Sequence, residues 1–245
     1  MNTQKYLADL HTHTIASGHA YNTINEMVEA ARSRGVKLYG ITEHAVTMPG
    51  TCTNFYFSNL KNARRDYEEI EVLYGVELNI IDYSGQVDMP EELLKQMDLA
   101  IASIHSGIGF TPGTVDENTG AVISAMENPY VNIIGHPDDG RVPLDYERIV
   151  KAAKETGTLL EINNSSLSPN SFRAGAKEND RTMLKLCMEY RVPVVIGSDA
   201  HSDLVVGNHD MAFELMQEIG FDKELVMNFN IERLKTFLNK YKNFI

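Results

Sequence analysis

Seven short apolar runs alternate with longer stretches of helical character along this chain of 245 residues, and this alternation limits the fold more than any other feature. The runs are Tyr6 to Leu10, Leu38 to Thr42, Val72 to Leu78, Leu99 to Ile104, Val131 to Gly135, Thr158 to Ile162 and Val194 to Gly197. Strands that alternate with helices in this way are parallel and are joined by right-handed crossovers. The pattern therefore predicts an α/β fold, and a parallel barrel of this length would be ordinary.

Helix boundary signals stand between the runs. The capping-box pattern from Thr23 to Glu26 predicts a helix that Gly35 ends, and Pro90 predicts another that begins at Glu91. Further helices are expected over residues 58–71, 119–127, 146–156 and 180–190, with two more after the last run. Residues 82–88 have the composition of a turn, and the Gly-rich stretch 106–119 is expected to form a loop on the active-site face.

No linker rich in Pro, Gly or Ser interrupts the alternation, so one domain is expected over residues 1–245. The motifs described below span residues 6–207, and residues 208–245 are expected to form C-terminal helices that pack on the barrel. Cys52 and Cys187 form no CxxC pair and are expected to be reduced, with Cys187 as a small core residue. His209 lies beyond the motifs and is interpreted as a surface or structural residue.

Composition argues against some classes of partner. The formal net charge of −12 disfavours a long nucleic acid, because binding one needs clustered Lys and Arg. No apolar run approaches the roughly 18 residues of a membrane-spanning helix. The polar start of the chain, residues 1–5, does not resemble a signal peptide, so the expected compartment is the cytoplasm.

Residues with metal-ligand chemistry gather where the apolar runs end. In parallel barrels the catalytic groups collect at the C-terminal ends of the strands. The candidates at those ends are His11, His13 and His19 after the first run, then His44, Glu77, His105 and His136, and finally Asp199 and His201 after the seventh. Imidazole and carboxylate groups suit zinc, iron and manganese, and this set is rich enough to bind up to three divalent ions.

The stretch from Asp9 to His13 carries the clearest local pattern. Alternate side chains of a strand share a face, so Asp9, His11 and His13 are expected to point the same way. The two imidazoles would then bind one ion, while Asp9 would accept a ring N–H behind them and fix the tautomer. The stretch Asp199-Ala200-His201 repeats the ligand spacing near the other end of the chain.

Together and in this order, these motifs resemble the PHP superfamily, named for polymerase and histidinol phosphatase. The matching stretches are Asp9-Leu10-His11-Thr12-His13, Ile41-Thr42-Glu43-His44, Gly75-Val76-Glu77, His105, Ile134-Gly135-His136-Pro137 and Gly197-Ser198-Asp199-Ala200-His201. The length, His19 and the stretch Glu161-Ile162-Asn163-Asn164-Ser165-Ser166 are most similar to the compact bacterial phosphatases of the YcdX type. One departure is Ala200, where relatives often have Ser.

The resemblance implies a single-domain, distorted (β/α)7 TIM-like barrel with a trinuclear metal site at the C-terminal ends of its strands. Carried over position by position, His11, His13, Glu77 and Asp199 would bind one ion, Glu77 would bridge to a second bound with His105 and His136, and His19, His44 and His201 would bind the third. Zinc is the expected metal, with iron or manganese as alternatives. The family also implies a homotrimer.

The predicted activity is hydrolysis of a small phosphomonoester by a metal-bridging hydroxide. Arg173, Arg141, Asn163 and Ser165 are candidate contacts to the phosphate, and ordinary roles in loops are their alternative. The same ions would also serve a phosphodiesterase or a nucleotide hydrolase, and a metal-binding scaffold without turnover is a further alternative. The amidohydrolase group ranks low, because it typically has a bridging Lys on strand four, where this chain has His105.

Overall fold

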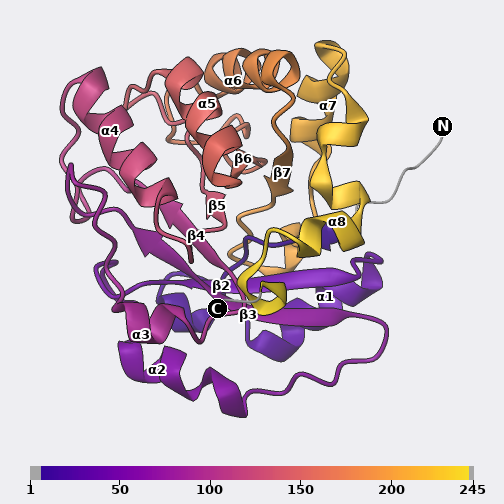
Figure 1. Ribbon diagram of the computed structural model, residues 1–245. Helices are drawn as coiled ribbons and strands as arrows, with labels where there is room; N and C mark the ends of the chain where they lie inside the picture. The colour runs from indigo at the N-terminus through magenta and orange to yellow at the C-terminus, as the bar shows by residue number, and fades with distance from the viewer. Residues whose placement is uncertain (1–6, 243–245) are drawn as a thin grey trace.

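A computed structural model describes residues 7–242, in which seven parallel strands stand side by side in the order of the chain. The strands are β1 (Ala8–Asp9), β2 (Leu38–His44), β3 (Glu71–Asn79), β4 (Ala100–Ser103), β5 (Ile133–Ile134), β6 (Leu159–Asn163) and β7 (Val194–Gly197). They curve into a nearly closed barrel with helices between them (Figure 1). The predicted distorted (β/α)7 barrel is confirmed. The first strand is shorter than predicted, and Tyr6 lies outside the described residues.

Among residues 7–242 the helices are α1 (Ile24–Ser33), α2 (Asn54–Asn59), α3 (Glu91–Leu94), α4 (Val115–Met126), α5 (Tyr146–Thr156), α6 (Ala176–Tyr190), α7 (Asp210–Glu218) and α8 (Ile231–Lys235). Helices α4 to α7 follow one another around one side of the strands (Figure 1). The capping box of Thr23 and Glu26 forms as predicted. A second box, from Thr114 to Glu117, begins α4, so the predicted start at residue 119 is too late.

The helix predicted over residues 58–71 is wrong. The chain instead forms α2 and a 3-10 turn at Leu60–Asn62, after which the backbone becomes extended. Tertiary contacts outweigh the local helical pattern there. The carbonyl oxygen of Arg64 accepts a hydrogen bond from the Tyr74 hydroxyl at 2.5 Å, and the Arg65 guanidinium pairs with Asp98 at 2.6 Å. These contacts need a non-helical chain at residues 64–65, and a turn at residues 68–69 then leads into β3.

The inner faces of the strands build an apolar floor beneath the rim. Its members form one buried cluster, made of Ala8, Leu10, Leu38, Leu73, Leu99, Ile101, Ile133, Leu159 and Val195. The alternate, outward-facing residues of the same strands pack against the helices in a larger cluster, which includes Tyr39 and Tyr74. Because the floor is packed with side chains, the polar residues above it stand on a rigid base.

The barrel closes incompletely between β1 and β7. Within the described residues, an isolated bridge from Thr12 to Ala200 joins the two ends near the rim. Lower down, the buried Asn228 side chain accepts a hydrogen bond from the Ile196 N–H at 2.7 Å. Its amide donates to the carbonyl oxygens of Ala8 and Ile196 at 2.9 and 2.8 Å. One side chain therefore satisfies backbone groups that a continuous ladder would have paired.

The segment that follows α7 packs under the barrel. Met227, Leu234 and Leu238 join the apolar floor. Glu71, the first residue of β3, forms an ion pair with Lys240 at 2.8 Å and so ties this segment to the sheet. The assignment of residues 1–245 to one domain stays a prediction.

Two further expectations concern the cysteines and membrane spans. Cys187 is fully buried in the outer cluster, as predicted for a core residue. Cys52 is half-buried, and both are free thiols. Within residues 7–242, no helix combines the length and the apolar character that crossing a bilayer requires.

Candidate metal centre

The rim of the barrel brings the predicted ligands together around Glu77. His44 ends β2 and Glu77 lies in β3, while the other candidates stand in the loops that follow β1, β4, β5 and β7. Glu77 is fully buried. Imidazole nitrogens lie 2.7 to 3.4 Å from its two carboxylate oxygens, contributed by His11, His13, His44, His105 and His136. The centre of the site is therefore one carboxylate inside a shell of imidazoles.

Four donor atoms form a compact group on one side of this carboxylate. His11 Nε2 and His13 Nε2 each lie 3.4 Å from Glu77 Oε2. The same nitrogens lie 3.6 and 3.4 Å from Asp199 Oδ1. Zinc bonds to nitrogen and oxygen measure about 2.0–2.1 Å, so the edges of a tetrahedral zinc shell would measure about 3.3 Å. The four distances are near this value, and the ligand atoms of His11, His13 and Glu77 all lie within 4.8 Å of one another.

The second oxygen of Glu77 faces another pair of imidazoles. His136 Nε2 lies 3.0 Å and His105 Nε2 lies 3.3 Å from Glu77 Oε1. The Ser103 hydroxyl donates to the same oxygen at 2.7 Å. His105 Nδ1 lies 2.8 Å from the side-chain oxygen of Asn79, which accepts a hydrogen bond from it. This contact leaves the lone pair of His105 Nε2 directed at the centre.

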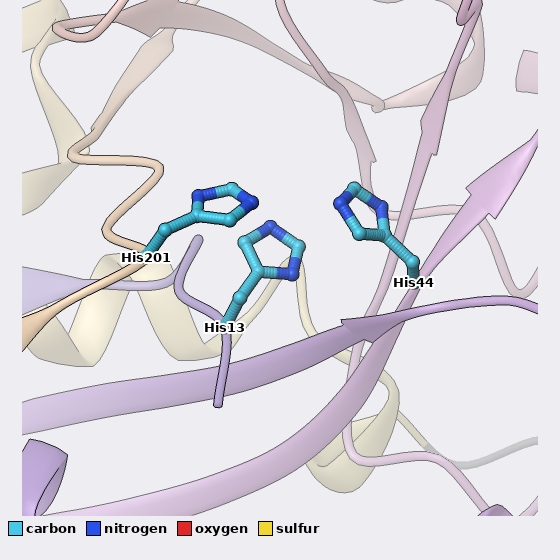
Figure 2. Close-up of side chains that lie close together, drawn as sticks. All are labelled: His13, His44 and His201. Carbon is cyan, nitrogen blue, oxygen red and sulfur yellow. The ribbon is translucent and has the colours of Figure 1, made fainter. Parts of the chain in front are cut away.

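A third group of imidazoles lies beside the first. His13, His44 and His201 come from three separate segments and point toward one another, with ring nitrogens within 4.8 Å (Figure 2). His19 stacks on both His44 and His201 with ring centroids 4.9 Å apart. The predicted third set is therefore one cluster of rings. Because His13 also belongs to that cluster, the rings alone do not assign each imidazole to a single ion.

Five buried polar atoms of the site make no well-aligned hydrogen bond in the described structure. They are His11 Nε2, His13 Nε2, both ring nitrogens of His44 and Glu77 Oε2, although His44 Nδ1 and Glu77 Oε2 form an ion-pair contact of 2.7 Å. A buried polar atom without a partner costs about 1–3 kcal/mol. Imidazole and carboxylate donors in this arrangement share one kind of partner, a divalent transition-metal ion. The residues present therefore fit the metal that the sequence predicts.

Asp9 does not lie behind the imidazoles, so its predicted contact is wrong. Its carboxylate accepts hydrogen bonds from the Ser198 N–H at 3.1 Å, the Ser198 hydroxyl at 2.6 Å and the Gly207 N–H at 2.7 Å. It also lies 3.6 Å from His209, which is fully buried and not on the surface. The β1 ladder ends at Asp9, so the two-residue period no longer applies at His11.

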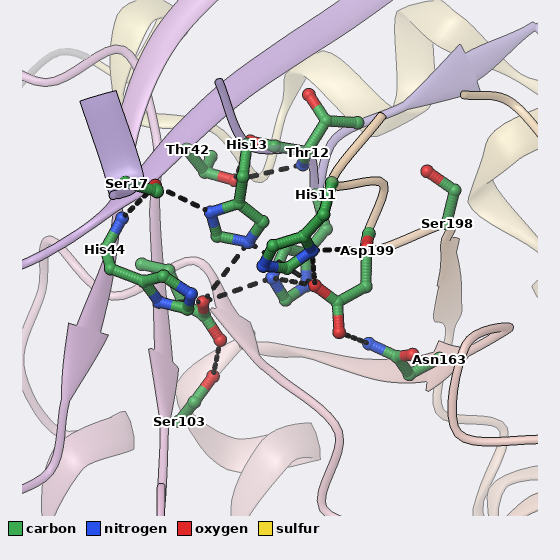
Figure 3. A network of polar contacts seen from close by, with 12 residues as sticks. His11, Thr12, His13, Ser17, Thr42, His44, Ser103, Asn163, Ser198 and Asp199 are labelled. Atoms are coloured by element: carbon green, nitrogen blue, oxygen red, sulfur yellow. Dashed lines mark hydrogen bonds and ion pairs between the residues drawn. The ribbon is translucent and has the colours of Figure 1, made fainter. Parts of the chain in front are cut away.

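Residues to which the sequence analysis gave no role of their own contact the imidazoles instead. Glu161 Oε1 accepts a hydrogen bond from His11 Nδ1 at 2.7 Å. Ser17 Oγ lies 3.1 Å from His13 Nδ1, a contact drawn in Figure 3. The same hydroxyl donates to Glu43 at 2.6 Å. Glu43 and Glu161 are both buried within strands. A carboxylate inside an otherwise apolar strand is the sequence signal that would have found them.

Burial and neighbouring charges shift the pKa values of the site residues in different directions. Burial opposes the charge on His11, but the nearby carboxylates, Glu161 foremost, raise its pKa well above the usual value. Burial also opposes the charge on Glu77, yet the surrounding imidazoles, His11 foremost, hold its pKa well below the usual value. Burial lowers the pKa of His13 well below normal and that of His136 to about 4. His13 and His136 are therefore neutral at pH 7, the form that binds metals.

Two of the predicted ligands have left-handed backbone conformations. These are His136, with φ of 30°, and Asp199, with φ of 53°. Such conformations cost about 1–3 kcal/mol and concentrate at functional sites. The Asp199 carboxylate is held by Arg173 Nη2 at 3.1 Å and by the Asn163 amide at 3.2 Å. These contacts fix the direction in which Asp199 faces the site.

A cavity of about 640 Å³ opens over the ligands and is the space available to a substrate. Three of the four predicted phosphate contacts, Arg141, Arg173 and Ser165, line this cavity. Arg141 is paired with Asp139 at 2.5 Å. Asn163 is fully buried and is not among the lining residues, so its contacts favour a supporting role.

A parallel (β/α)7 barrel with a candidate metal centre at its rim defines the class of this protein, and comparison with known proteins gives its family. The PHP domain model matches residues 9–220, and the chain belongs to that family. The chain is 43% identical over 234 residues to a probable phosphatase of Clostridium novyi, which covers 96% of this chain and 95% of the relative. It is 42% identical over 238 residues to a probable phosphatase of Acetivibrio thermocellus, which covers 97% of both chains.

Among solved structures, the fold is similar to a histidinol phosphate phosphatase of Lactococcus lactis, complexed with zinc, L-histidinol and phosphate. The TM-score is 0.61, and the match covers 89% of this chain and 95% of the other. Sequence identity is 16%, so this likeness concerns the fold alone.

Proposed function

We propose that this protein is a metal-dependent phosphatase that hydrolyses small phosphomonoesters. The observation that carries the proposal is the convergence of buried, unpartnered imidazole and carboxylate atoms beneath an open cavity. Membership of the PHP family and two relatives named probable phosphatases support it. The histidinol phosphate phosphatase of similar fold supports a small phosphorylated substrate.

The proposed site holds three divalent ions. His11, His13, Glu77 and Asp199 would bind the first, Glu77 would bridge to a second bound by His105 and His136, and His19, His44 and His201 would bind the third. Distances of 3.4 to 3.6 Å between the donors of the first set support that assignment. Zinc is the proposed metal, with iron and manganese as alternatives, since imidazole and carboxylate suit all three.

Bound divalent ions would neutralise the phosphate and generate the nucleophile, a bridging hydroxide, from water. The chain's own residues prepare the site for this chemistry. The contacts of Glu161 and Ser17 fix the orientation of the His11 and His13 rings. Arg173 aligns Asp199 and lines the cavity, where its guanidinium is placed to attract a phosphate. Arg141 and Ser165 are proposed as further phosphate contacts from the cavity wall.

The direct test is metal reconstitution of the purified chain. Protein stripped with a chelator would be supplied with Zn²⁺, Mn²⁺ or Fe²⁺ and assayed on p-nitrophenyl phosphate and on bis-p-nitrophenyl phosphate, with the metal content measured in parallel. Metal-dependent cleavage of the monoester is expected. Cleavage confined to the diester would indicate a phosphodiesterase, and bound metal without turnover on either ester would indicate a scaffold.

Single substitutions test the proposed roles of His11 and Arg173. His11→Ala is expected to lose metal and activity together, and fewer than two ions per chain in the wild type would contradict the trinuclear site. Arg173→Ala is expected to lower kcat/KM about 10²-fold, the usual cost of one charge-stabilising donor. Arg148→Ala is the control, since Arg148 pairs with Asp116 on the exposed surface. Equal kcat/KM values for these two Arg variants would contradict the role of Arg173.

The proposed assembly is a homotrimer, which sedimentation equilibrium of the metal-loaded protein would test. The proposed compartment is the cytoplasm, which fractionation of the source cells would test.

A further inference from the structure

We propose that Glu161 is the positioning residue of the metal centre: it fixes the tautomer of His11 and aligns the ends of β5, β6 and β7 around one ion. The inference rests on the proposed function in one respect, that His11 is a metal ligand. Glu161 lies in β6, is 1% exposed and is not itself among the residues that line the cavity. Its action on the reaction therefore passes through other residues.

The contacts of Glu161 explain why this position needs a carboxylate. Its Oε1 lies 2.7 Å from His11 Nδ1. Its Oε2 lies 2.8 Å from the backbone nitrogen of His136 and 3.1 Å from the side-chain nitrogen of Asn163. All three partners donate, and an ionised carboxylate is the side chain that accepts at both ends. Because Glu161 cannot donate, the proton of neutral His11 sits on Nδ1 and the lone pair of Nε2 faces Glu77 and Asp199.

The same carboxylate reaches the other side of the site through Asn163. The Asn163 amide group donates both to Glu161 Oε2 and to Asp199 Oδ2, at 3.1 and 3.2 Å. Its oxygen accepts from Arg173 at 3.3 Å, which fixes the orientation of the amide. Figure 3 shows Asn163 joined to Asp199, with the His11 ring close by. Glu161 thus contacts His11 directly and Asp199 through Asn163, and both are proposed ligands of the same ion.

The backbone leaves room for this carboxylate at Gly197. A Cβ added to Gly197 would lie 2.0 Å from Glu161 Oε1 and 3.0 Å from His11 Cβ. Any other residue at this position would push the Glu161 carboxylate away from His11. A substitution at Gly197 therefore offers a second way to disturb the contact between Glu161 and His11, and it leaves the charge of the site unchanged.

The decisive variant is Glu161→Gln, because an amide cannot accept at both ends. In one orientation its NH2 group faces the N–H of His136 and the amide of Asn163. In the other orientation its NH2 group donates to His11 Nδ1 and moves the ring proton to Nε2, the nitrogen that faces the ion. Loss of such an outer contact typically weakens metal binding about 10- to 100-fold, and this is the expected loss of zinc affinity.

The measurement is zinc affinity of the full chain by competition with a chromophoric chelator, with no substrate present. The second readout is the tautomer of His11 in the metal-free protein, read from long-range ¹H–¹⁵N NMR at a pH above the raised pKa of His11, where the ring is neutral. The His11 signals are those that are missing from the spectrum of His11→Gln. Asp98→Asn is the matched control: Asp98 is a buried carboxylate at the opposite end of the barrel that accepts from the Tyr74 N–H at 2.8 Å. It is expected to leave zinc affinity and tautomer unchanged, although it lowers stability.

Gly197→Ala keeps the proposal falsifiable if Glu161→Gln fails to fold. It is expected to weaken zinc binding in the same range, whereas Gly120→Ala, where an added Cβ meets nothing within 4 Å, is expected to have no effect. Wild-type zinc affinity in either site variant, an unchanged His11 tautomer in Glu161→Gln, or an equal loss of affinity in Asp98→Asn would overturn the proposal.

The experiments test the phosphatase assignment independently of the role of Glu161. If the wild type hydrolyses no phosphate ester while Glu161→Gln still weakens zinc binding, the phosphatase assignment falls and the role of Glu161 stands. If the wild type is an active phosphatase and Glu161→Gln binds zinc normally, the reverse holds.

Discussion

Asp9→Asn offers the sharpest test of how the rim is held, because Asp9 anchors the loop that carries Asp199 and His201. The Asp9 carboxylate is fully buried and accepts three hydrogen bonds from two residues, Ser198 and Gly207. The Ser198 hydroxyl can rotate and donate or accept, but the two backbone N–H groups can only donate. An Asn side chain has one accepting oxygen, so either orientation of the amide leaves one of these N–H groups facing another donor.

The expected cost follows from these contacts. One buried N–H without a partner costs about 1–3 kcal/mol, and the hydrogen bonds that remain lose the extra strength of a charged acceptor, roughly 1 kcal/mol. Asp9→Asn is therefore expected to lower the free energy of unfolding by about 2–4 kcal/mol at pH 7. Burial opposes the charge on Asp9, but His209 and Ser198 lower its pKa. The lowered pKa means that the difference between wild type and variant is present above pH 3.8 and shrinks as the pH falls further.

The assay is equilibrium urea unfolding of the metal-free wild type and variant, at pH 7 and at pH 3. Asp210→Asn is the control, because Asp210 is exposed at the start of α7, and its expected effect is within about 0.5 kcal/mol. The reasoning is refuted if Asp9→Asn costs no more than this control at pH 7. It is also refuted if the whole loss persists at pH 3, below the ordinary pKa of 3.8, where the unfolded chain already binds a proton at Asp9.

Three further predictions address the metal, the C-terminal segment and the closure of the barrel. Chelation of bound metal is expected to lower the midpoint of thermal unfolding by about 8–16 °C. Metal at a thousandfold its Kd stabilises the fold by about 4 kcal/mol, and each kcal/mol shifts the midpoint of a chain of this size by about 2–4 °C. Calorimetry with and without EDTA measures this shift. Glu71→Gln is expected to cost about 1–2 kcal/mol at pH 7, a figure discounted for partial exposure. Burial opposes the Glu71 charge, but Lys240 foremost, with Tyr241 and Lys235, holds its pKa at about 2, so the urea curves of wild type and variant should converge as the pH falls from 4.5 toward 2. Asn228→Ala is expected to cost about 3–5 kcal/mol in urea unfolding, because it leaves buried strand groups unpaired, and a loss under about 1 kcal/mol would contradict that account.

Local patterns were sufficient for much of the fold. The apolar runs placed the strands, because a strand buried on both faces needs a continuous apolar sequence. The box of Thr23 and Glu26 placed one helix start, and the same signal at Thr114 and Glu117 would have placed another. The failure at residues 58–71 has a different cause: a chain of good helix formers is held extended by contacts of Arg64 and Arg65 with distant residues. No local pattern contains those contacts.

The sequence by itself determined which side chains stand at the rim, since a polar residue that ends a strand of a parallel barrel must lie at the common C-terminal edge. That argument brought His11 and Glu77 together although they are far apart in the chain, and their nitrogen and oxygen lie 3.4 Å apart. Tertiary structure alone decided what stands behind those ligands. Glu161 makes the contact with His11 that spacing predicted for Asp9. The β1 ladder stops at Asp9, and strand register brings Glu161 against His11 from 150 residues away. Periodicity fixes the face of a residue along its own strand, but a partner on another strand depends on register and closure, which arise only when the whole barrel is packed.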